Sequence, residues 1–205
     1  MSTDTATADT HTEHDPLATN TGISNNKLAM WLFLGTECLL FGGLISTYLL
    51  YKTRGNGTTV PTDIFDIPFT SVSSFVLLMS SLTMVLALSS LQRGDVERSR
   101  GWLLTTAMLG GGFIGGQVYE FTSFYREGIG FTTNPASSAF FTLTGFHGVH
   151  VSLGILMLMS LVVASIQGRL KPQNAETVEI VGLYWHFVDI VWIFIFTVIY
   201  LIPAE

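Results

Sequence analysis

Residues 182–201 read GLYWHFVDIVWIFIFTVIYL, and this stretch decides the fold class. A helix needs about 20 apolar residues to cross a bilayer, because each residue adds about 1.5 Å and the hydrocarbon is about 30 Å thick. Only His186 and Asp189 interrupt the apolar character of the stretch. Extended outward, it predicts a membrane-spanning helix over residues 178–202, with Glu179 at its edge.

Four further segments have the same length and character, and the charged residues of the chain lie mostly between them: 28–51, 69–91, 101–121 and 139–166. A backbone in lipid must satisfy its own hydrogen bonds, and these segments lack the short alternating pattern of barrel strands. The sequence therefore predicts an all-α integral membrane bundle of five transmembrane helices. Residues 28–205 would form this single membrane domain, and residues 1–27 a polar, disordered tail.

The composition supports a membrane protein and excludes other classes. Of 205 residues, 12% are charged and 48% hydrophobic, whereas about 25% charged residues is usual in a soluble domain. This excludes a disordered chain, and the single Cys38 excludes a disulfide-stapled module. The net charge of −6 argues against a nucleic-acid binder, which needs a basic face.

The basic residues between the segments predict the orientation, because cytoplasmic loops carry an excess of Lys and Arg. One side of the membrane would carry six of them: Lys27, Arg93, Arg98, Arg100, Arg169 and Lys171. The other side would carry three: Lys52, Arg54 and Arg126. This difference places the N-terminus in the cytoplasm and the C-terminus outside.

Ionisable side chains inside a bilayer are costly, and each therefore needs a reason. Counted from the cytoplasmic end, Glu37, His186 and Asp189 lie about 13, 12 and 16 Å deep. His150 enters from the other side and reaches a similar depth, with His147 about one turn further out. We therefore expect these five residues to share one buried polar layer.

This layer has two interpretations, which the residues alone leave open. It is either a proton-active or redox site, or a set of hydrogen bonds that joins helices where no hydrophobic drive exists.

Glu120 differs, because it lies near the outer end of its segment, where we expect it to reach water. The glycines of residues 110–116 form GxxxG pairs that predict close helix packing, at Gly111, Gly112, Gly115 and Gly116.

The residue counts limit the chemistry of the chain. A heme could in principle lie between His186 and either His147 or His150, but Asp189 is a more natural partner for His186. A binuclear copper centre needs two thiolates, and Cys38 is alone. Nucleotide-binding fingerprints are absent. We therefore expect no catalytic residue and no metal ligand on this chain.

Four strings, in this order and spacing, resemble subunit III of the heme–copper oxygen reductases, in the cytochrome c oxidase branch and in its five-helix form. They are MWLFLGTECLLFGGL at residues 30–44, GQVYEF at 116–121, TGFHGVHVSLG at 144–154, and the stretch at 182–201. The resemblance covers residues 29–200. It implies an accessory subunit of a multi-pass complex in a prokaryotic plasma membrane.

The resemblance also implies cofactors and partners. The chain would carry no redox centre, would pack on catalytic subunit I and support its proton uptake, and would bind phospholipid. Heme and copper are expected in partner subunits, including subunit II. The complex would oxidise cytochrome c, reduce oxygen to water and pump protons.

Six residues fall on positions of this family. Glu37 matches a buried carboxylate that reacts with carbodiimide, and the others are Glu120, His147, His150, His186 and Asp189. Long members have seven helices and a lipid-filled cleft, whereas this chain lacks the first pair. We expect an extended subunit I to supply that pair.

Two alternatives remain open. One is subunit III of a quinol oxidase or of a nitric oxide reductase, because the electron donor is recognised by other chains. The other is a stand-alone proton or solute carrier that uses Glu37, His150 and Asp189 as a relay. The lack of an inverted repeat argues against the carrier.

Overall fold

A computed structural model describes residues 22–54 and 67–202 of the chain. Five long helices follow one another, with a short 3₁₀-helix before the last and a π-helix after it: α1 Asn25–Arg54, α2 Ile67–Gln92, α3 Val96–Arg126, α4 Pro135–Ile166, η2 Pro172–Asn174, α5 Ala175–Phe196 and η3 Thr197–Leu201. These residues contain no strand, which confirms the all-α prediction. Most of the predicted tail, residues 1–21, lies outside the described residues, and residues 25–27 belong to α1.

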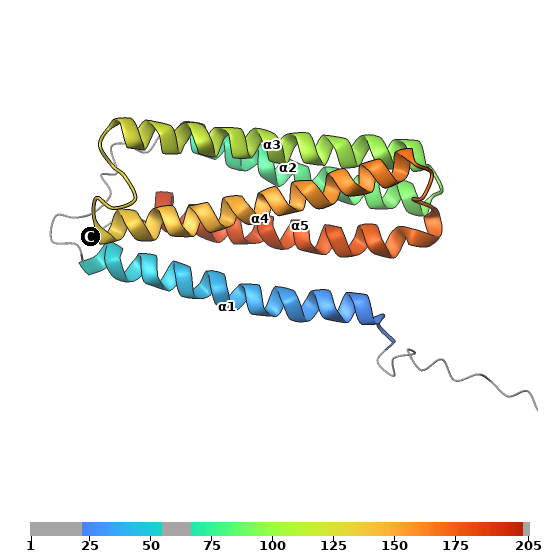
Figure 1. Cartoon of the computed structure of the whole chain (residues 1–205), viewed down its shortest axis with the longest axis horizontal. Coiled ribbons are helices and arrows are strands. Elements are labelled where there is room, and N and C mark those ends of the chain that lie inside the picture. The colour runs from blue at the N-terminus through green and yellow to red at the C-terminus, as the bar shows by residue number, and fades with distance from the viewer. Residues whose placement is uncertain (1–21, 55–66, 203–205) are drawn as a thin grey trace, which may run out of the picture.

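The five helices run side by side, and α5 occupies the centre (Figure 1). It contacts α1, α2 and α4, while α3 packs against α2 and α4. In the apolar 18-residue stretch of each helix, half of the residues are buried in α5 but only 11% in α1. Helix α1 is therefore the peripheral helix. Helices α1, α2, α4 and α5 are long and apolar enough to cross a membrane. The glycine-rich α3 is not among these four helices, because its sequence is less apolar.

Polar residues just outside the apolar segments start the helices earlier than the predicted spans. Ser24 accepts a hydrogen bond from the backbone N–H of Lys27 at the start of α1. Asp95 and Asn134 begin α3 and α4 in the same way. Each side chain satisfies one of the free N–H groups of a first turn, as N-cap residues do. The apolar pattern therefore predicts the extent of the membrane span, whereas the N-cap residues determine where the helix begins.

The end of α3 depends on a glycine. Gly128 has a φ of +83°, which favours residues without a Cβ. The next residue, Ile129, donates its backbone N–H to the carbonyl of Phe124 and buries its side chain against the bundle. This arrangement satisfies a carbonyl of the last turn and sends the chain back toward α4.

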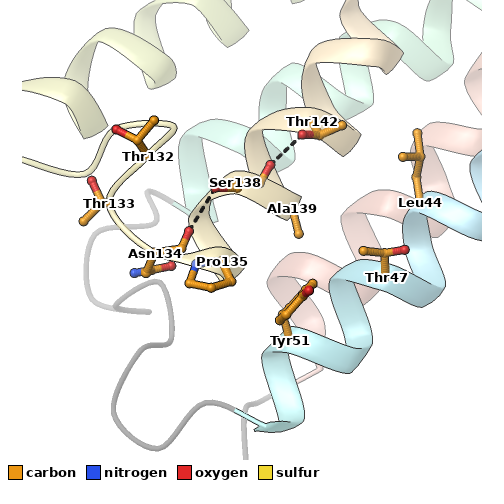
Figure 2. A pocket seen from close by; sticks show the side chains of 10 residues that line it. All are labelled: Leu44, Thr47, Tyr51, Thr132, Thr133, Asn134, Pro135, Ser138, Ala139 and Thr142. Atoms are coloured by element: carbon orange, nitrogen blue, oxygen red, sulfur yellow. Dashed lines mark hydrogen bonds between the residues drawn. The ribbon is translucent and has the colours of Figure 1, made fainter.

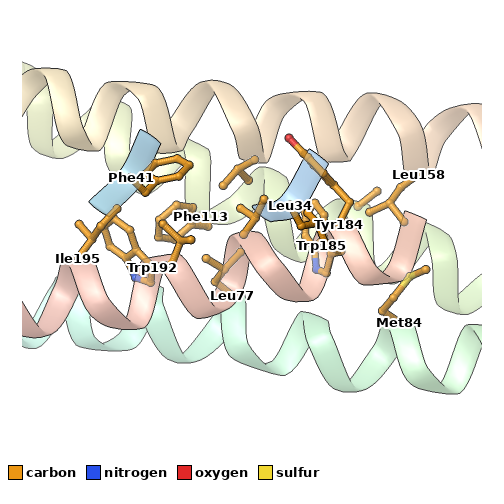
Figure 3. Close-up of a cluster of buried hydrophobic side chains, with 14 of the residues drawn as sticks. Leu34, Phe41, Leu77, Met84, Phe113, Leu158, Tyr184, Trp185, Trp192 and Ile195 are labelled. Carbon is orange, nitrogen blue, oxygen red and sulfur yellow. The ribbon is translucent and has the colours of Figure 1, made fainter. Parts of the chain in front are cut away.

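The indole of Trp185 on α5 forms the centre of the core (Figure 3). A Cβ added at Gly110 on α3 would lie 2.5 Å from the indole, and one added at Gly154 on α4 would lie 2.8 Å from it. Its N–H donates to Ser80 on α2, at 2.9 Å. About two turns further along α5, Trp192 donates to Ser74 on α2, at 2.8 Å. These contacts bring four helices together around one side chain.

The structure corrects the prediction for the glycines of α3. An added Cβ at Gly111, Gly112 or Gly115 would have no atom of residues 22–54 or 67–202 within 4 Å, so these glycines do not bring the described helices together. The close contacts fall instead on Gly110 and on Gly116, where a Cβ would lie 3.1 Å from Ser73 on α2. The reason is the helical register, because the buried stripe of α3 runs through Gly110, while the other three glycines face outward.

Neighbouring glycines of α3 offer a matched test of this packing. We expect Gly110→Ala to lower the stability of the full chain in detergent by about 1–3 kcal/mol, because Gly154 behind the indole prevents Trp185 from moving away. Gly111→Ala has the same effect on helix propensity without the clash and should be neutral or stabilising. Thermal unfolding of both variants measures the difference. Equal unfolding midpoints would contradict this account of the core.

Candidate functional site

Glu37 on α1 and His150 on α4 form a hydrogen-bonded pair. Glu37 Oε2 lies 3.1 Å from His150 Nε2, and the side chains are only 14% and 12% exposed. His150 Nδ1 lies 2.7 Å from the carbonyl of Phe146, which only accepts, so Nδ1 carries a hydrogen. Nε2 then either accepts the proton of a neutral carboxyl or donates to a carboxylate as imidazolium. In both forms the pair has no net charge, which suits an apolar surrounding.

A second polar group joins α2 to α5. Ser81 donates its hydroxyl hydrogen to Asp189, and its oxygen lies 3.0 Å from His186 Nδ1. Among the described residues, no hydrogen bond links this group to Glu37 or His150. The hydrogen bonds therefore divide the predicted layer into two separate contacts. The sequence analysis missed Ser81, because a serine in an apolar segment carries no distinctive signal.

His147 lies in the aromatic core instead of the hydrogen-bonded groups. Its ring is fully buried and stacks on Trp192 with centroids 4.8 Å apart. Phe113 and Phe41 pack against this ring in T-shaped arrangements, with centroids 5.8 and 6.5 Å away. Neither ring nitrogen has a hydrogen-bond partner in the part of the chain that the structure describes. His147 therefore packs as an aromatic side chain, apart from Glu37 and Asp189.

Glu120 is buried, contrary to the expectation that it reaches water. Only 8% of the residue is exposed. The Tyr200 hydroxyl donates to Glu120 Oε1 at 2.7 Å, and the Thr70 hydroxyl donates to the same atom at 3.1 Å. Tyr200 belongs to the π-helix η3 and Thr70 to the first turn of α2. The end of the last helix and the start of α2 therefore both cover the carboxylate. The linear sequence does not reveal this cover, because Tyr200 is 80 residues away.

Polar contacts also hold the two ends of α1, which has little apolar burial. Near its start, Lys27 Nζ lies 2.5 Å from Glu179 Oε1 on α5. Near its end, Lys52 Nζ donates to the carbonyls of Val198 and Ile202, at 2.8 and 2.6 Å. These carbonyls lie at the C-terminal end of the last helix. A cation there is favourable, because the last carbonyls of a helix lack partners within it. The sequence analysis used Lys52 only as one of the basic residues that predict orientation. It did not predict that Lys52 binds the carbonyls of the last helix.

A groove of about 430 Å³ runs between α1 and α4 beside the Glu37–His150 pair. Its walls are apolar, and His150 and Tyr184 bring polar atoms to it. The Tyr184 hydroxyl already donates to the carbonyl of His150, at 3.0 Å. The groove therefore offers a mainly apolar surface with the imidazole at one side.

A larger cavity of about 630 Å³ lies where the end of α1 meets the start of α4 (Figure 2). Hydroxyl groups line it, but several already have partners in the chain. Ser138 donates to the carbonyl of Phe131, and Thr142 to that of Ser138. These hydrogen bonds stabilise the first turns of α4.

Across residues 22–54 and 67–202, no three His, Cys, Asp or Glu side chains lie together as a metal site requires.

Comparison with known proteins identifies the family. A sequence model of the family described as cytochrome c oxidase subunit III matches residues 3–203. The chain belongs to this family. Cytochrome c oxidase subunit 3 of Bacillus sp. (strain PS3) is 42% identical over 177 residues, which is 86% of either chain. Quinol oxidase subunit 3 of Bacillus subtilis (strain 168) is 38% identical over 176 residues, again 86% of either chain.

Family and structure together place the chain in a membrane. It is a multi-pass integral membrane protein of a prokaryotic plasma membrane, with four helices that are long and apolar enough to cross it. As a subunit III it is one part of an oxidase complex and has partner subunits. The relatives carry both oxidase names, so the family alone leaves the electron donor open.

Two substitutions of Glu37 separate the hydrogen bond from the charge. Glu37→Gln can still donate to His150 Nε2, so we expect near-normal assembly and stability. Glu37→Leu leaves Nε2 buried without a partner, so we expect a loss of about 1–3 kcal/mol. Thermal unfolding of the purified chain and its yield in membranes measure both effects. If Glu37→Gln were as harmful as Glu37→Leu, the neutral form of the pair would be ruled out.

Proposed function

We propose that this chain is accessory subunit III of a cytochrome c oxidase. It carries no redox centre and stabilises the flank of catalytic subunit I, which takes up protons. The supporting observation is that the buried ionisable groups join neighbouring helices. Glu37 on α1 forms a hydrogen bond with His150 on α4. Asp189 and His186 on α5 both form hydrogen bonds with Ser81 on α2. A carrier relay needs a continuous polar path, and these two contacts are not joined by hydrogen bonds among the described residues.

Sequence identity to one relative favours the cytochrome c branch over the quinol branch. The cytochrome c oxidase relative from strain PS3 is 42% identical, and the quinol oxidase relative from Bacillus subtilis is 38% identical. However, the cytochrome c oxidase subunit 3 of Bacillus subtilis is also 38% identical, over 178 residues. Subunit III of a quinol oxidase is therefore the second candidate. Heme and copper would be held by the partner subunits in both cases.

We further propose that α3 is a fifth membrane span and that the N-terminus is cytoplasmic. Helix α3 packs along α2 and α4, so it shares their environment. The start of α1, the α2–α3 turn and the α4–α5 connection lie at one end of the bundle (Figure 1). This end carries the six basic residues that the orientation rule assigns to the cytoplasm.

Phospholipid binding is proposed for the groove between α1 and α4. An acyl chain needs an apolar channel that is open along its length, and the lining of this groove is mainly apolar. It lies beside α1, the helix with least burial, so a lipid there would complete the packing of α1. The Glu37–His150 pair would hold the two walls of the groove at a fixed separation.

Purification with a mild detergent tests the proposed function. We expect the tagged chain, taken from its own membranes, to bring larger chains and a heme a band in the reduced-minus-oxidised spectrum. The eluate should oxidise reduced cytochrome c. Turnover with a quinol but not with cytochrome c would assign it to the quinol branch. A colourless eluate without partners, from membranes with an intact oxidase, would overturn the subunit assignment.

Asp189 offers a test of the structural role. Asp189→Leu removes the acceptor of Ser81 and leaves buried polar groups without a partner. We expect about tenfold less of this chain per heme in the purified complex. Asp189→Asn keeps a carbonyl acceptor for Ser81 and should assemble nearly normally. Densitometry of the subunits against heme absorbance measures both, and a normal content of Asp189→Leu would contradict the role.

A further inference from the structure

One surface of the bundle combines apolar side chains with a half-buried imidazole. We define the α2–α5 face by three residues on each helix: Leu78, Ser81 and Val85 on α2, and His186, Ile190 and Ile193 on α5. The four aliphatic side chains are between 39% and 52% exposed. His186 lies about 16 Å along α5 from its start, near the middle of the bundle. The face is therefore apolar at membrane depth, except at Ser81 and His186.

The hydrogen bonds of Ser81 determine what His186 presents at this face. The hydroxyl hydrogen of Ser81 goes to Asp189, so its oxygen accepts from His186 Nδ1–H, at 3.0 Å. A neutral imidazole with a hydrogen on Nδ1 has a bare acceptor at Nε2. Among the described residues, Nε2 has no hydrogen-bond partner. His186 is half-buried, and Nε2 is not among the enclosed polar atoms of the bundle, so it offers an unused acceptor at the surface.

His186 differs here from the other candidate residues of the helices. Asp189 Oδ1 also lacks a hydrogen-bond partner among the described residues, but it is buried inside the bundle. Glu37 and His150 satisfy each other, and Glu120 is covered by Tyr200. The nitrogens of His147 lie inside the core, where nothing from outside reaches them. In hydrocarbon an unused polar atom finds no partner, and polar side chains in membranes accordingly pair across helices.

We propose that the α2–α5 face is the docking surface for a transmembrane helix of a partner subunit, which donates a hydrogen bond to His186 Nε2. The proposal rests on the proposed function, in which the chain is one subunit of an oxidase complex. The donor is a hydroxyl, amide, indole N–H or cationic side chain. The aliphatic residues around His186 pack against the apolar surface of the same helix.

Other occupants of this face fit the chemistry less well. Acyl chains of lipid have no hydrogen-bond donor to offer at this depth. A second copy of the chain, related by a two-fold axis, would bring the same face against itself. Two Nε2 acceptors would then meet without a hydrogen between them. A different chain with a donor satisfies both the acceptor and the apolar surroundings.

Two substitutions of His186 distinguish an external contact from an internal one. Asn places its amide near the position of Nδ1 and keeps the contact with Ser81, but it does not reach outward. Gln reaches the position of Nε2 and gives up the contact with Ser81. In the tagged complex we expect His186→Asn to lower the amount of this chain per heme about threefold or more after washing, and His186→Gln to retain it. The reverse order, or equal retention, would overturn the proposal.

Photo-crosslinking locates the partner directly. A photoreactive phenylalanine analogue at Ile190, in the full complex in membranes, should give a product with a different, larger subunit. The control position is Val149, which is 58% exposed on α4, away from this face. A product between two copies of this chain, or none from Ile190, would overturn the docking surface. Failure of the proposed function is distinguishable, because the unsubstituted chain would then purify without heme.

Discussion

The close contact of Trp185 with two glycine backbones sets the arrangement of the helices. The indole lies against Gly110 on α3 and Gly154 on α4, while its N–H holds Ser80 on α2. In an apolar solvent a bundle gains little from burying hydrophobic surface, so close packing and hydrogen bonds must supply the association. A large ring between two glycines provides the packing, and the indole N–H provides the bond. The register of α5 against α2 follows, because Trp192 repeats the contact at Ser74.

This register places the polar residues of α5. His186 directly follows Trp185, and Asp189 lies between the two tryptophans. With both indoles bound to serines of α2, Asp189 and His186 meet Ser81. The polar contact is therefore a consequence of the aromatic one. A change that displaced Trp185 would also separate Ser81 from its two partners.

The sequence predicted the class of fold and the helices, because long apolar segments depend only on local composition. It also identified Glu37, His150, His186 and Asp189 as unusual, because charge in an apolar segment is conspicuous. It did not predict the pairing, since partners such as Ser81 and Tyr200 are ordinary residues in a linear sequence. The glycines of α3 illustrate the same limit, because the spacing of Gly111 and Gly115 is correct for packing, but the register turns them outward.

The polar contacts of α1 and of the α2–α5 face have opposite consequences for assembly. Helix α1 buries little apolar surface, yet Lys27, Glu37 and Lys52 all find partners within the chain. These three side chains therefore need no hydrogen bond from another protein. His186, in contrast, uses one nitrogen inside the chain, and the other has no partner in the part of the chain that the structure describes. A partner that satisfies this nitrogen gains a hydrogen bond that lipid cannot give, so the unsatisfied atom favours association and fixes the orientation in which it occurs.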